Sequence, residues 1–262
     1  MRIAVLGGDG RFEHLRQLLQ QRGFVLQQDV SRAAAVILPL PALDGEGRIR
    51  GTALTADALL AQLQQHTLLL GGQLPAAFLQ KAAARQLTAR DYYLDEQLLA
   101  ENAAATAEGA LALLIETLPV VLRGSRIAVI GYGRIGSRLA QLLQALGAAV
   151  TVYARSEAAR QSASAAGHTA CPIQQLGKER FAAFCNTVPA PIMREEELAA
   201  VCGQTLWLEL ASVPGGLCRC GADSGVHVLP AQGLPGRFSP HSAAEWILDA
   251  VMCILSREGY HA

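Results

Sequence analysis

The stretch that most constrains this chain is an apolar segment, Ile127–Ile130, that runs directly into Gly131-Tyr-Gly-Arg-Ile-Gly136. In such a turn the first glycine makes the bend, the second lets a pyrophosphate approach the backbone, and the third lets a helix pack against the strand. The spacing alone is a weak signal, but leucines recur at helical spacing as far as Leu146, and a second apolar strand, Ala149–Ala154, follows. The stretch therefore predicts a dinucleotide-binding turn. The turn residues assigned to the cofactor are Gly131, Gly133, Arg134, Ile135 and Gly136.

The residues after that second strand bear on the choice of cofactor. Enzymes that use NAD usually carry Asp or Glu there for the ribose hydroxyls, whereas this chain has Arg155-Ser156. A cation suits a 2′-phosphate, and hydrogen bonds to charged groups contribute roughly 1.5–3 kcal/mol. We therefore predict NADP rather than NAD, bound by Arg155 and Ser156. A further apolar strand from Phe184 ends in the residues expected on the nicotinamide side, which are Asn186, Thr187 and Val188.

Strand-like and helix-like patterns alternate from the start of the chain to a long alanine-rich segment that ends near residue 118. This alternation predicts a parallel sheet, and 262 residues are enough for two domains. We predict an α/β fold of two doubly wound parallel sheets, joined by long helices across a cleft. Residues 1–117 would form a flavodoxin-like substrate domain, completed by a helix within 240–262, and residues 118–239 a Rossmann-type NADP-binding domain.

The first strand, Arg2–Leu6, runs into Gly7-Gly-Asp-Gly-Arg11. This loop lacks a third glycine at the required spacing, so it is not predicted to be a second cofactor site. Asp9 and Arg11 follow the carboxyl end of a strand, where open α/β sheets bind ligands, and we predict that they bind substrate. A solvated loop pair is the alternative. The long loop from Ala42 to Gly51 is a candidate substrate lid.

The alanine-rich segment, residues 95–118, is long enough to bridge two domains as a helix. Asn102, Thr106 and Glu108 interrupt its apolar pattern, and Gly109 lowers helix propensity by about 1 kcal/mol against alanine. These residues suggest a wall of the cleft, with Thr106 binding substrate and Glu108 as a candidate proton acceptor. The alternative is a helix with one solvated face.

The stretch Leu206–Gly216 predicts another buried strand that ends in a glycine loop at the same edge of the sheet. It carries Glu209 and Ser212. We expect the Ser212 hydroxyl to bind a substrate carboxylate. Glu209 is either a functional carboxylate or a charge at the end of a strand without a chemical role, and the sequence leaves both interpretations open.

The last informative stretch begins a helix at Ser239-Pro240, because serine favours the cap and proline the first helical position. His241 and Ser242 would then lie at the helix N-terminus. Backbone N–H groups, a hydroxyl and an imidazole together suit a substrate that carries carboxylates. We predict that Ser242 binds substrate and that His241 is catalytic as a proton acceptor, while a purely structural histidine remains the alternative.

Charge and cysteine usage exclude several classes of function. The 22 basic and 22 acidic residues give a net charge of zero, so nothing indicates nucleic acid or an anionic membrane as a partner. The N-terminal strand is too short for a signal or spanning segment. The six cysteines lack zinc-site spacing, and the close pair Cys218-Arg-Cys220 is interpreted as ordinary thiols. We predict a cytoplasmic protein without a bound metal.

Several short motifs occur together along nearly the full length of the chain. They are Gly7–Arg11, Gly45–Gly47, Thr106–Gly109, Gly131–Gly136, Ala154–Ser156, Asn186–Pro189, Leu210–Gly216 and Gly233–Gly236. In this combination the chain resembles the family of the dipicolinate synthase A subunit, the oxidoreductase component of the system that makes pyridine-2,6-dicarboxylate in spore formers. The resemblance implies NADP-linked oxidation of a dihydrodipicolinate-type dicarboxylate from the lysine pathway. It also implies that the partner is the flavoprotein-like B subunit of dipicolinate synthase and that the location is the sporulating mother cell, and it leaves a homo-oligomer possible.

The chain departs from that family at three positions. The family usually has Lys at His241, Asp at Glu209 and Gly at Ala244. A neutral imidazole does not hold a carboxylate as a lysine does, so the departure at His241 concerns the substrate more than the fold.

Two other functions compete with this interpretation. Ser239-Pro-His-Ser-Ala243 resembles the segment that carries the acid/base histidine of D-2-hydroxy acid dehydrogenases. Against this, the arginine expected after Leu210 is absent and no Glu is spaced to orient the imidazole, so an α-keto acid carboxylate has no anchor. A non-catalytic protein that binds cofactor or dicarboxylate and holds its partner is also open, because no residue is an indispensable nucleophile or metal ligand.

Overall fold

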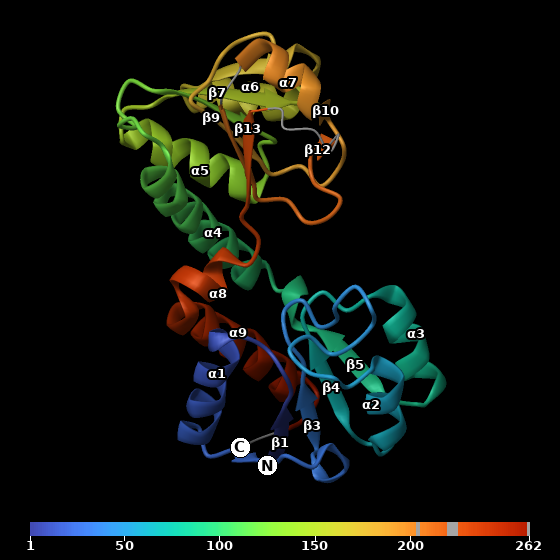
Figure 1. Ribbon diagram of the computed structural model, residues 1–262. Helices are drawn as coiled ribbons and strands as arrows, with labels where there is room; N and C mark the ends of the chain where they lie inside the picture. The colour runs from blue at the N-terminus through green and yellow to red at the C-terminus, as the bar shows by residue number, and fades with distance from the viewer. Residues whose placement is uncertain (203–204, 219–224, 261–262) are drawn as a thin grey trace. The chain divides into compact units, whose positions relative to one another are not determined.

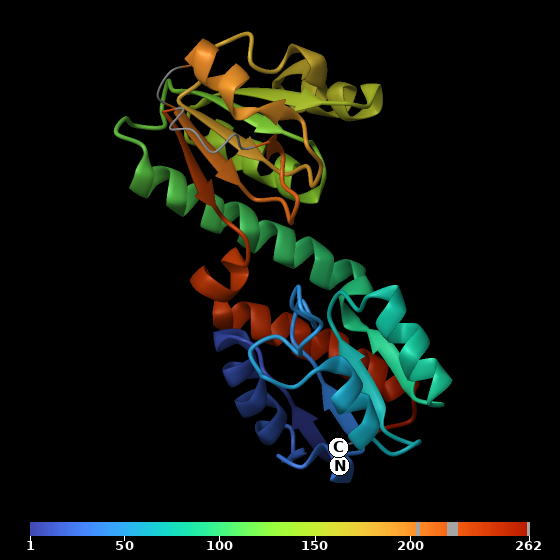
Figure 2. The same ribbon diagram turned by 45° about the vertical axis from the view of Figure 1, so that its right-hand side comes forward.

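The structure, a computed structural model, describes residues 1–202, 205–218 and 225–260 and divides into two compact units. The first unit contains Met1–Asn102 and Gly236–Ala262, and the second contains Ala103–Pro235. The division falls inside helix α4 (Glu96–Thr117), whereas the sequence predicts it after residue 117. The reason is that one continuous helix, drawn in green in Figure 2, contributes to two hydrophobic cores. Leu98 lies in the first core and Ala107 in the second.

The first unit is built on a five-stranded parallel sheet in the order β2-β1-β3-β4-β5, the flavodoxin-like doubly wound arrangement. Its strands are β1 (Arg2–Val5), β2 (Val25–Leu26), β3 (Ala35–Ile37), β4 (Leu68–Gly71) and β5 (Thr88–Asp91). Helices α2 (Ala56–Gln62) and α3 (Ala76–Ala84) cover one face, and α1 (Gly10–Gln21) and α9 (Pro240–Arg257) cover the other (Figure 1). Short 3-10 turns lie at Val30–Arg32 and Tyr92–Leu94.

Helix α9 belongs to the first unit although it comes from the far end of the chain. Its apolar residues repeat at helical spacing and pack on α1 and the sheet. The buried ones are Ala244, Ile247, Leu248, Val251 and Leu255 from α9, with Phe12, Leu15 and Leu19 from α1. The first unit is therefore assembled from two separate chain segments.

The second unit is built on a six-stranded parallel sheet in the order β13-β11-β9-β6-β7-β8. Numbered along the chain this is the 3-2-1-4-5-6 order of dinucleotide-binding folds. The strands are β6 (Arg126–Ile130), β7 (Ala149–Ala154), β8 (Thr169–Pro172), β9 (Ala183–Asn186), β11 (Thr205–Glu209) and β13 (Val226–Pro230). A small parallel pair, β10 (Met193–Arg194) and β12 (Leu217–Cys218), lies outside this sheet. The predicted fold class, two doubly wound parallel sheets with the second of Rossmann type, is confirmed.

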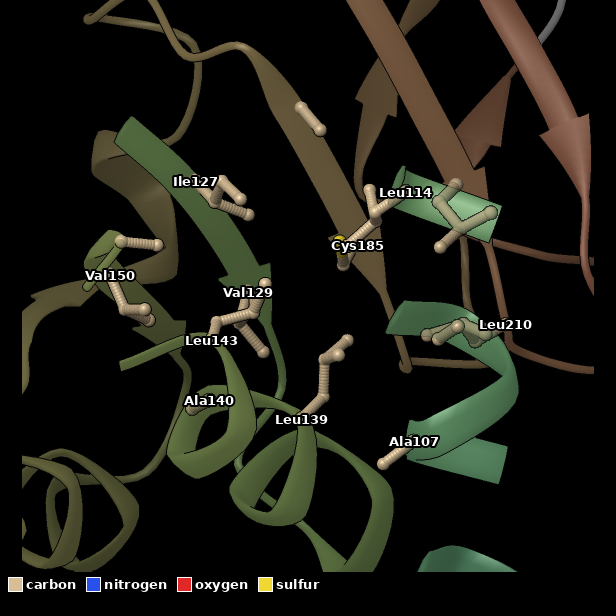
Figure 3. Packing of buried hydrophobic residues seen from close by; sticks show 14 of the residues in the cluster. Ala107, Leu114, Ile127, Val129, Leu139, Ala140, Leu143, Val150, Cys185 and Leu210 are labelled. Atoms are coloured by element: carbon tan, nitrogen blue, oxygen red, sulfur yellow. The ribbon is translucent and has the colours of Figure 1, made fainter. Parts of the chain in front are cut away.

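The helices of the second unit pack on both faces of its sheet. They are α5 (Arg134–Ala145), α6 (Glu157–Ala165), α7 (Glu195–Cys202), part of α8 (Leu234–Phe238) and a 3-10 turn at Ile173–Gln175. Figure 3 shows Leu139 and Leu143 of α5 and Leu114 of α4 among the strand residues Val129 and Cys185. Helices α4 and α5 thus bury one face of the sheet around the strand that leads into the glycine turn.

Helix α4 is also the one helix of the described residues that is long and apolar enough, by length and composition, to cross a membrane. Half of the apolar window is buried inside the protein. Ala107, Ala110, Leu113 and Leu114 lie in the core of the second unit. Packing in this core therefore accounts for the apolar character of the buried half of α4.

Candidate dinucleotide site

The glycine turn connects β6 to α5 at the point where the strand order of the second sheet reverses, because β6 pairs with β7 on one side and β9 on the other. Gly131 has φ of +89°, and a Cβ there would lie 2.5 Å from Thr187 Oγ1. A Cβ on Gly136 would collide with the carbonyl oxygen of Gly131. Around Gly133, by contrast, no described atom lies within 4 Å of such a Cβ. Gly131 therefore makes the bend, Gly133 leaves the backbone open to an approaching group, and Gly136 lets the helix pack closely on the turn.

The neighbouring strand end fixes this turn from the side. Thr187 donates two hydrogen bonds to the carbonyl oxygen of Ile130, from its hydroxyl at 2.8 Å and its backbone N–H at 2.9 Å. Asn186 is fully buried, donates from Nδ2 to the carbonyl of Val188 at 3.0 Å, and accepts from the N–H of Val188 at 3.1 Å. Of the three residues predicted here, Thr187 and Val188 therefore line the turn, whereas the Asn186 side chain is engaged inside the protein.

Arg155 is exposed directly after β7, and Ser156 is the N-cap of α6, where its hydroxyl accepts from the N–H of Ala159 at 3.3 Å. A third polar residue, Arg160, shares this corner and was not predicted from the sequence. Its Nη1 donates to the carbonyl oxygens of Ala154 and Arg155 at 3.1 and 2.8 Å. No local motif marks Arg160, since only the turn of α6 brings it back over the strand end.

Glu209 lies at the end of β11 and is 9% exposed. Its Oε1 accepts from Asn186 Nδ2 at 2.6 Å and from the N–H of Ala211 at 3.1 Å. Its Oε2 accepts from Trp207 Nε1 at 3.0 Å and from the N–H of Gly216 at 2.9 Å. The carboxylate therefore connects two strand ends and the glycine loop. It is neither a free functional group nor a solvated charge at a strand end.

Ser212 lies on the glycine loop that Glu209 holds and is exposed. The carbonyl oxygen of Ser212 accepts from the N–H of Gly215 at 3.0 Å. Gln232 braces the base of the loop by donating to the carbonyls of Glu209 and Ala211 at 3.0 and 2.8 Å. The Ser212 side chain is thus presented at the carboxyl edge of the sheet, the edge that also carries the glycine turn.

In the first unit, Asp9 and Arg11 bind each other. Arg11 Nε lies 2.9 Å from Asp9 Oδ1 and Arg11 Nη2 lies 2.8 Å from Asp9 Oδ2, while Nη2 also donates to the carbonyl of Leu40 at 2.7 Å. The Arg11 side chain is 6% exposed and that of Asp9 is 47% exposed. Burial acts to raise the pKa of Asp9, but hydrogen bonds and charge from Arg11 lower it below its ordinary value. The arginine is therefore already neutralised, and only the Asp9 carboxylate reaches solvent.

The predicted lid, residues 42–51, is folded against the first glycine loop. Isolated antiparallel β-bridges pair Leu43 with Ile49 and Arg48 with Thr55. The N–H of Gly8 donates to the carbonyl of Arg50 at 3.1 Å. These contacts give the loop a defined structure in the first unit.

His241 lies in the first turn of α9, is exposed, and stacks on His14 of α1 with ring centroids 3.8 Å apart and planes at 30°. Ser242 beside it is half-buried. The helix begins at Pro240 as predicted, although Ser239 as N-cap makes no side-chain capping hydrogen bond. His14 could not be inferred from sequence, because it lies at the opposite end of the chain and in no motif.

Thr106 and Glu108 are on different sides of α4. Thr106 is buried and Glu108 is exposed, as expected for two residues that are two apart in a helix. Both lie in the second unit, with Ser212 and the glycine turn, whereas Asp9, Arg11, His241 and Ser242 lie in the first. A single substrate site that combines the two groups remains a prediction.

No three His, Cys, Asp or Glu side chains within residues 1–202, 205–218 and 225–260 are placed to hold a metal ion. Cys171, Cys185, Cys202, Cys218 and Cys253 are free thiols. Burial raises the pKa of Cys185 to about 12, so this thiol stays protonated. Cys220 lies outside the described residues.

A cavity of about 330 Å³ lies at the amino ends of β6, β7 and β8, the edge opposite the glycine turn. His168 lines it and is 5% exposed, and neither of its ring nitrogens has a hydrogen-bond partner within the described chain. The ring of Tyr132, from the glycine turn, meets the imidazole edge-on at 5.9 Å. Burial lowers the pKa of His168 below its ordinary value, so the neutral imidazole is the form that the fold favours.

This burial predicts a specific loss of stability in acid. The unfolded chain takes up a proton at His168 near pH 6.5 and the folded chain only at lower pH, so the free energy of unfolding falls as the pH drops below about 6.5. In His168→Phe this contribution should vanish. Urea denaturation at pH 7.5, 6.5 and 5.5 measures it, with the exposed His66→Gln as control. Equal acid sensitivity of His168→Phe and the wild type would contradict the prediction.

Comparison with known proteins agrees with this geometry. The family described as "D-isomer specific 2-hydroxyacid dehydrogenase, NAD binding domain" matches residues 88–190, which include the glycine turn and Asn186–Val188. The A subunit of dipicolinate synthase from Bacillus subtilis is 29% identical, and the match covers 98% of this chain and 96% of that protein. The chain resembles this dipicolinate synthase protein over nearly its full length. It is an oxidoreductase with a nicotinamide-dinucleotide-binding domain.

Two crystal structures of dipicolinate synthase A subunits share the fold. The one from Bacillus subtilis has a TM-score of 0.81 and 26% identity, covering 98% of this chain and 96% of that chain. The one from Bacillus halodurans has a TM-score of 0.84 and 22% identity, covering 98% of each chain. The similarity to dipicolinate synthase A subunits thus extends over both units, whereas the match to the 2-hydroxyacid dehydrogenase family model is confined to residues 88–190.

Proposed function

We propose that the chain catalyses the NADP-dependent oxidation of a dihydrodipicolinate-type intermediate to dipicolinate, together with the B subunit of dipicolinate synthase, in the mother cell of a sporulating organism. The observation that carries this proposal is the nearly full-length similarity to a protein named as the A subunit of dipicolinate synthase. The dinucleotide-binding domain supports the oxidative step, because removal of hydrogen from a ring carbon requires a hydride acceptor.

The residues of the second unit fit a dinucleotide. The space above Gly133 admits a pyrophosphate, and the N-terminus of α5 directs its first-turn N–H groups and a favourable dipole toward that space. Thr187 and Val188 border the turn on the side of β9. When bound, the nicotinamide supplies the hydride acceptor. Arg155 would donate to the 2′-phosphate that distinguishes NADP from NAD.

The substrate residues proposed in each unit keep the roles assigned to them from the sequence. Ser212 and Ser242 would donate hydroxyl hydrogen bonds to the two carboxylates, and the N–H groups at the start of α9 would assist. Thr106 and the exposed Asp9 carboxylate would complete the site, with Arg11 behind Asp9. Because an ionised carboxylate only accepts hydrogen bonds, Asp9 would face an N–H or O–H group of the substrate and not its carboxylates. His241 would accept the proton that leaves as the ring becomes aromatic, and Glu108 is the other candidate for that proton.

The direct test is NADPH formation by purified protein given freshly generated dihydrodipicolinate, with and without the B subunit. We expect NADPH to form, and His241→Asn to lower turnover while NADP binding stays intact. Absence of reduction with either preparation would favour a non-catalytic binding protein. Reduction of NADP or NAD with D-2-hydroxy acids alone would favour a D-2-hydroxy acid dehydrogenase, the activity suggested by the dinucleotide-binding domain. Loss of NADP binding in His241→Asn would assign the histidine to the cofactor instead.

The cofactor choice has its own prediction. Arg155→Asp should weaken NADP binding by about ten- to a hundredfold, because a charge-assisted hydrogen bond is replaced by repulsion from the 2′-phosphate. NAD binding should change little, because NAD lacks that phosphate. Titration of both cofactors measures the effect, with Arg123→Asp as the control at another exposed arginine. Equal affinities for NAD and NADP before and after the Arg155 change would contradict the assignment.

A further inference from the structure

A second arginine lies at the corner where β7 meets α6. Arg160 is in the second turn of α6, and its guanidinium reaches back to the strand end. Nη1 donates to the carbonyl oxygens of Ala154 and Arg155 at 3.1 and 2.8 Å. Two carbonyl acceptors therefore orient the guanidinium before any ligand binds.

Most of the hydrogen-bonding capacity of Arg160 is still available. A guanidinium has five N–H donors, and the two strand carbonyls engage Nη1 only. Within the described residues, Nε and Nη2 form no hydrogen bond, and no carboxylate forms an ion pair with Arg160. The nearest acidic residue in sequence, Glu157, accepts from Gln161 Nε2 at 3.2 Å. Three oriented donors and a positive charge are thus left at the carboxyl end of β7.

The ligand that fits this corner is a phosphate monoester. Such a group carries close to two negative charges near neutral pH and three acceptor oxygens, more than one arginine satisfies. Arg155, directly after β7, is exposed and can add a second positive charge. A planar guanidinium binds phosphate through two parallel N–H donors, and Arg160 is already oriented for that geometry.

We propose that Arg160 is a specificity-determining residue that binds the 2′-phosphate of the cofactor together with Arg155. This inference rests on the proposed use of NADP and extends it to a residue outside the glycine turn and its neighbouring strand ends. The exposed Arg155 contributes a positive charge, and Arg160 contributes N–H donors whose orientation is fixed by its hydrogen bonds to the carbonyls at the strand end. The main chain between them couples the two, because the carbonyl of Arg155 is one of the acceptors that orient Arg160.

The test uses the fragments 2′,5′-ADP and 5′-AMP, which differ by the 2′-phosphate alone. Their dissociation constants are measured by titration calorimetry for the wild type, Arg160→Gln, Arg160→Lys, Arg155→Gln and the double Gln variant. We expect Arg160→Gln to weaken 2′,5′-ADP about tenfold, the cost of one charge-assisted hydrogen bond, and to change 5′-AMP less than about twofold. Arg160→Lys should recover part of the loss, since it keeps the charge without the fork. Arg123→Gln is the matched control.

Each outcome separates Arg160 from the cofactor assignment. A wild type that prefers 2′,5′-ADP, with an unchanged preference in Arg160→Gln, overturns the proposal for Arg160 and leaves NADP in place. Equal weakening of both fragments, or a lowered melting temperature that accounts for the change, also overturns it, because Arg160 would then act on the fold. A wild type without preference for 2′,5′-ADP overturns NADP itself and Arg160 with it.

Discussion

Glu209→Ala is expected to lower the free energy of unfolding by about 3 kcal/mol or more. The substitution leaves four donors inside the protein without their acceptor, and each buried unsatisfied donor costs roughly 1–3 kcal/mol. Those donors are Asn186 Nδ2, Trp207 Nε1 and the N–H groups of Ala211 and Gly216. Urea denaturation measures the loss. Because these donors also hold the Ser212 loop, turnover in the dihydrodipicolinate assay should fall as well.

Two further variants separate charge from shape at Glu209. Glutamine is nearly isosteric, but its NH₂ group would face donors, so Glu209→Gln should also be destabilising. Aspartate keeps an all-acceptor carboxylate on a shorter side chain, and Glu209→Asp should be the mildest of the three. The exposed Glu196→Ala is the control and should stay within about 0.5 kcal/mol of the wild type. A Glu209→Gln variant as stable as the wild type would show that the four donors do not need the carboxylate.

Gly136→Ala should lower the stability of the protein, whereas Gly133→Ala should mainly weaken NADP binding, although both positions lie in the same turn. A methyl on Gly136 meets the backbone of Gly131, so helix and strand must separate. We expect a loss of roughly 1–3 kcal/mol, as for overpacking in a core, and with it a loss of NADP binding. Gly133 has φ of −87° and open space around it. Its variant should stay within about 1 kcal/mol of the wild type, the range for changes at a helix N-cap.

The Gly133→Ala variant nevertheless should bind NADP at least about tenfold more weakly, because its methyl group occupies the space through which the pyrophosphate approaches the backbone. Thermal unfolding and NADP titration of both variants measure the two effects. A Gly133→Ala protein that is fully stable and binds NADP as the wild type does would mean that the dinucleotide does not lie over Gly133.

The parts of this structure that follow from sequence are those set by local patterns. The three glycines of the turn differ in purpose because of their spacing, and the alternation of strands and helices implies parallel sheets. The division inside α4 could not be predicted, because the helix itself continues without a break from one core into the other. The boundary depends on which core each turn packs against, and periodicity carries no such information.

The features of the site that sequence reasoning missed depend on tertiary contacts. Glu209 looks like any charge after a buried strand until Asn186 and Gly216 are seen to donate to it. Arg160 gains its place only when α6 turns back over β7. The stacking of His14 on His241 joins opposite ends of the chain. Each of these contacts forms only in the folded chain, and none is marked by a characteristic residue spacing in the sequence.

The discontinuous first unit has a consequence for how the protein is made. Its strands and α1 leave the ribosome early, but α9, which covers Phe12, Leu15 and Leu19, is translated only after the whole second unit. At typical rates of synthesis the delay is on the order of ten seconds. During that time the apolar face of α1 and its sheet is exposed to water or is covered by a chaperone. The part of the chain that is synthesised first is therefore the part that is finished last.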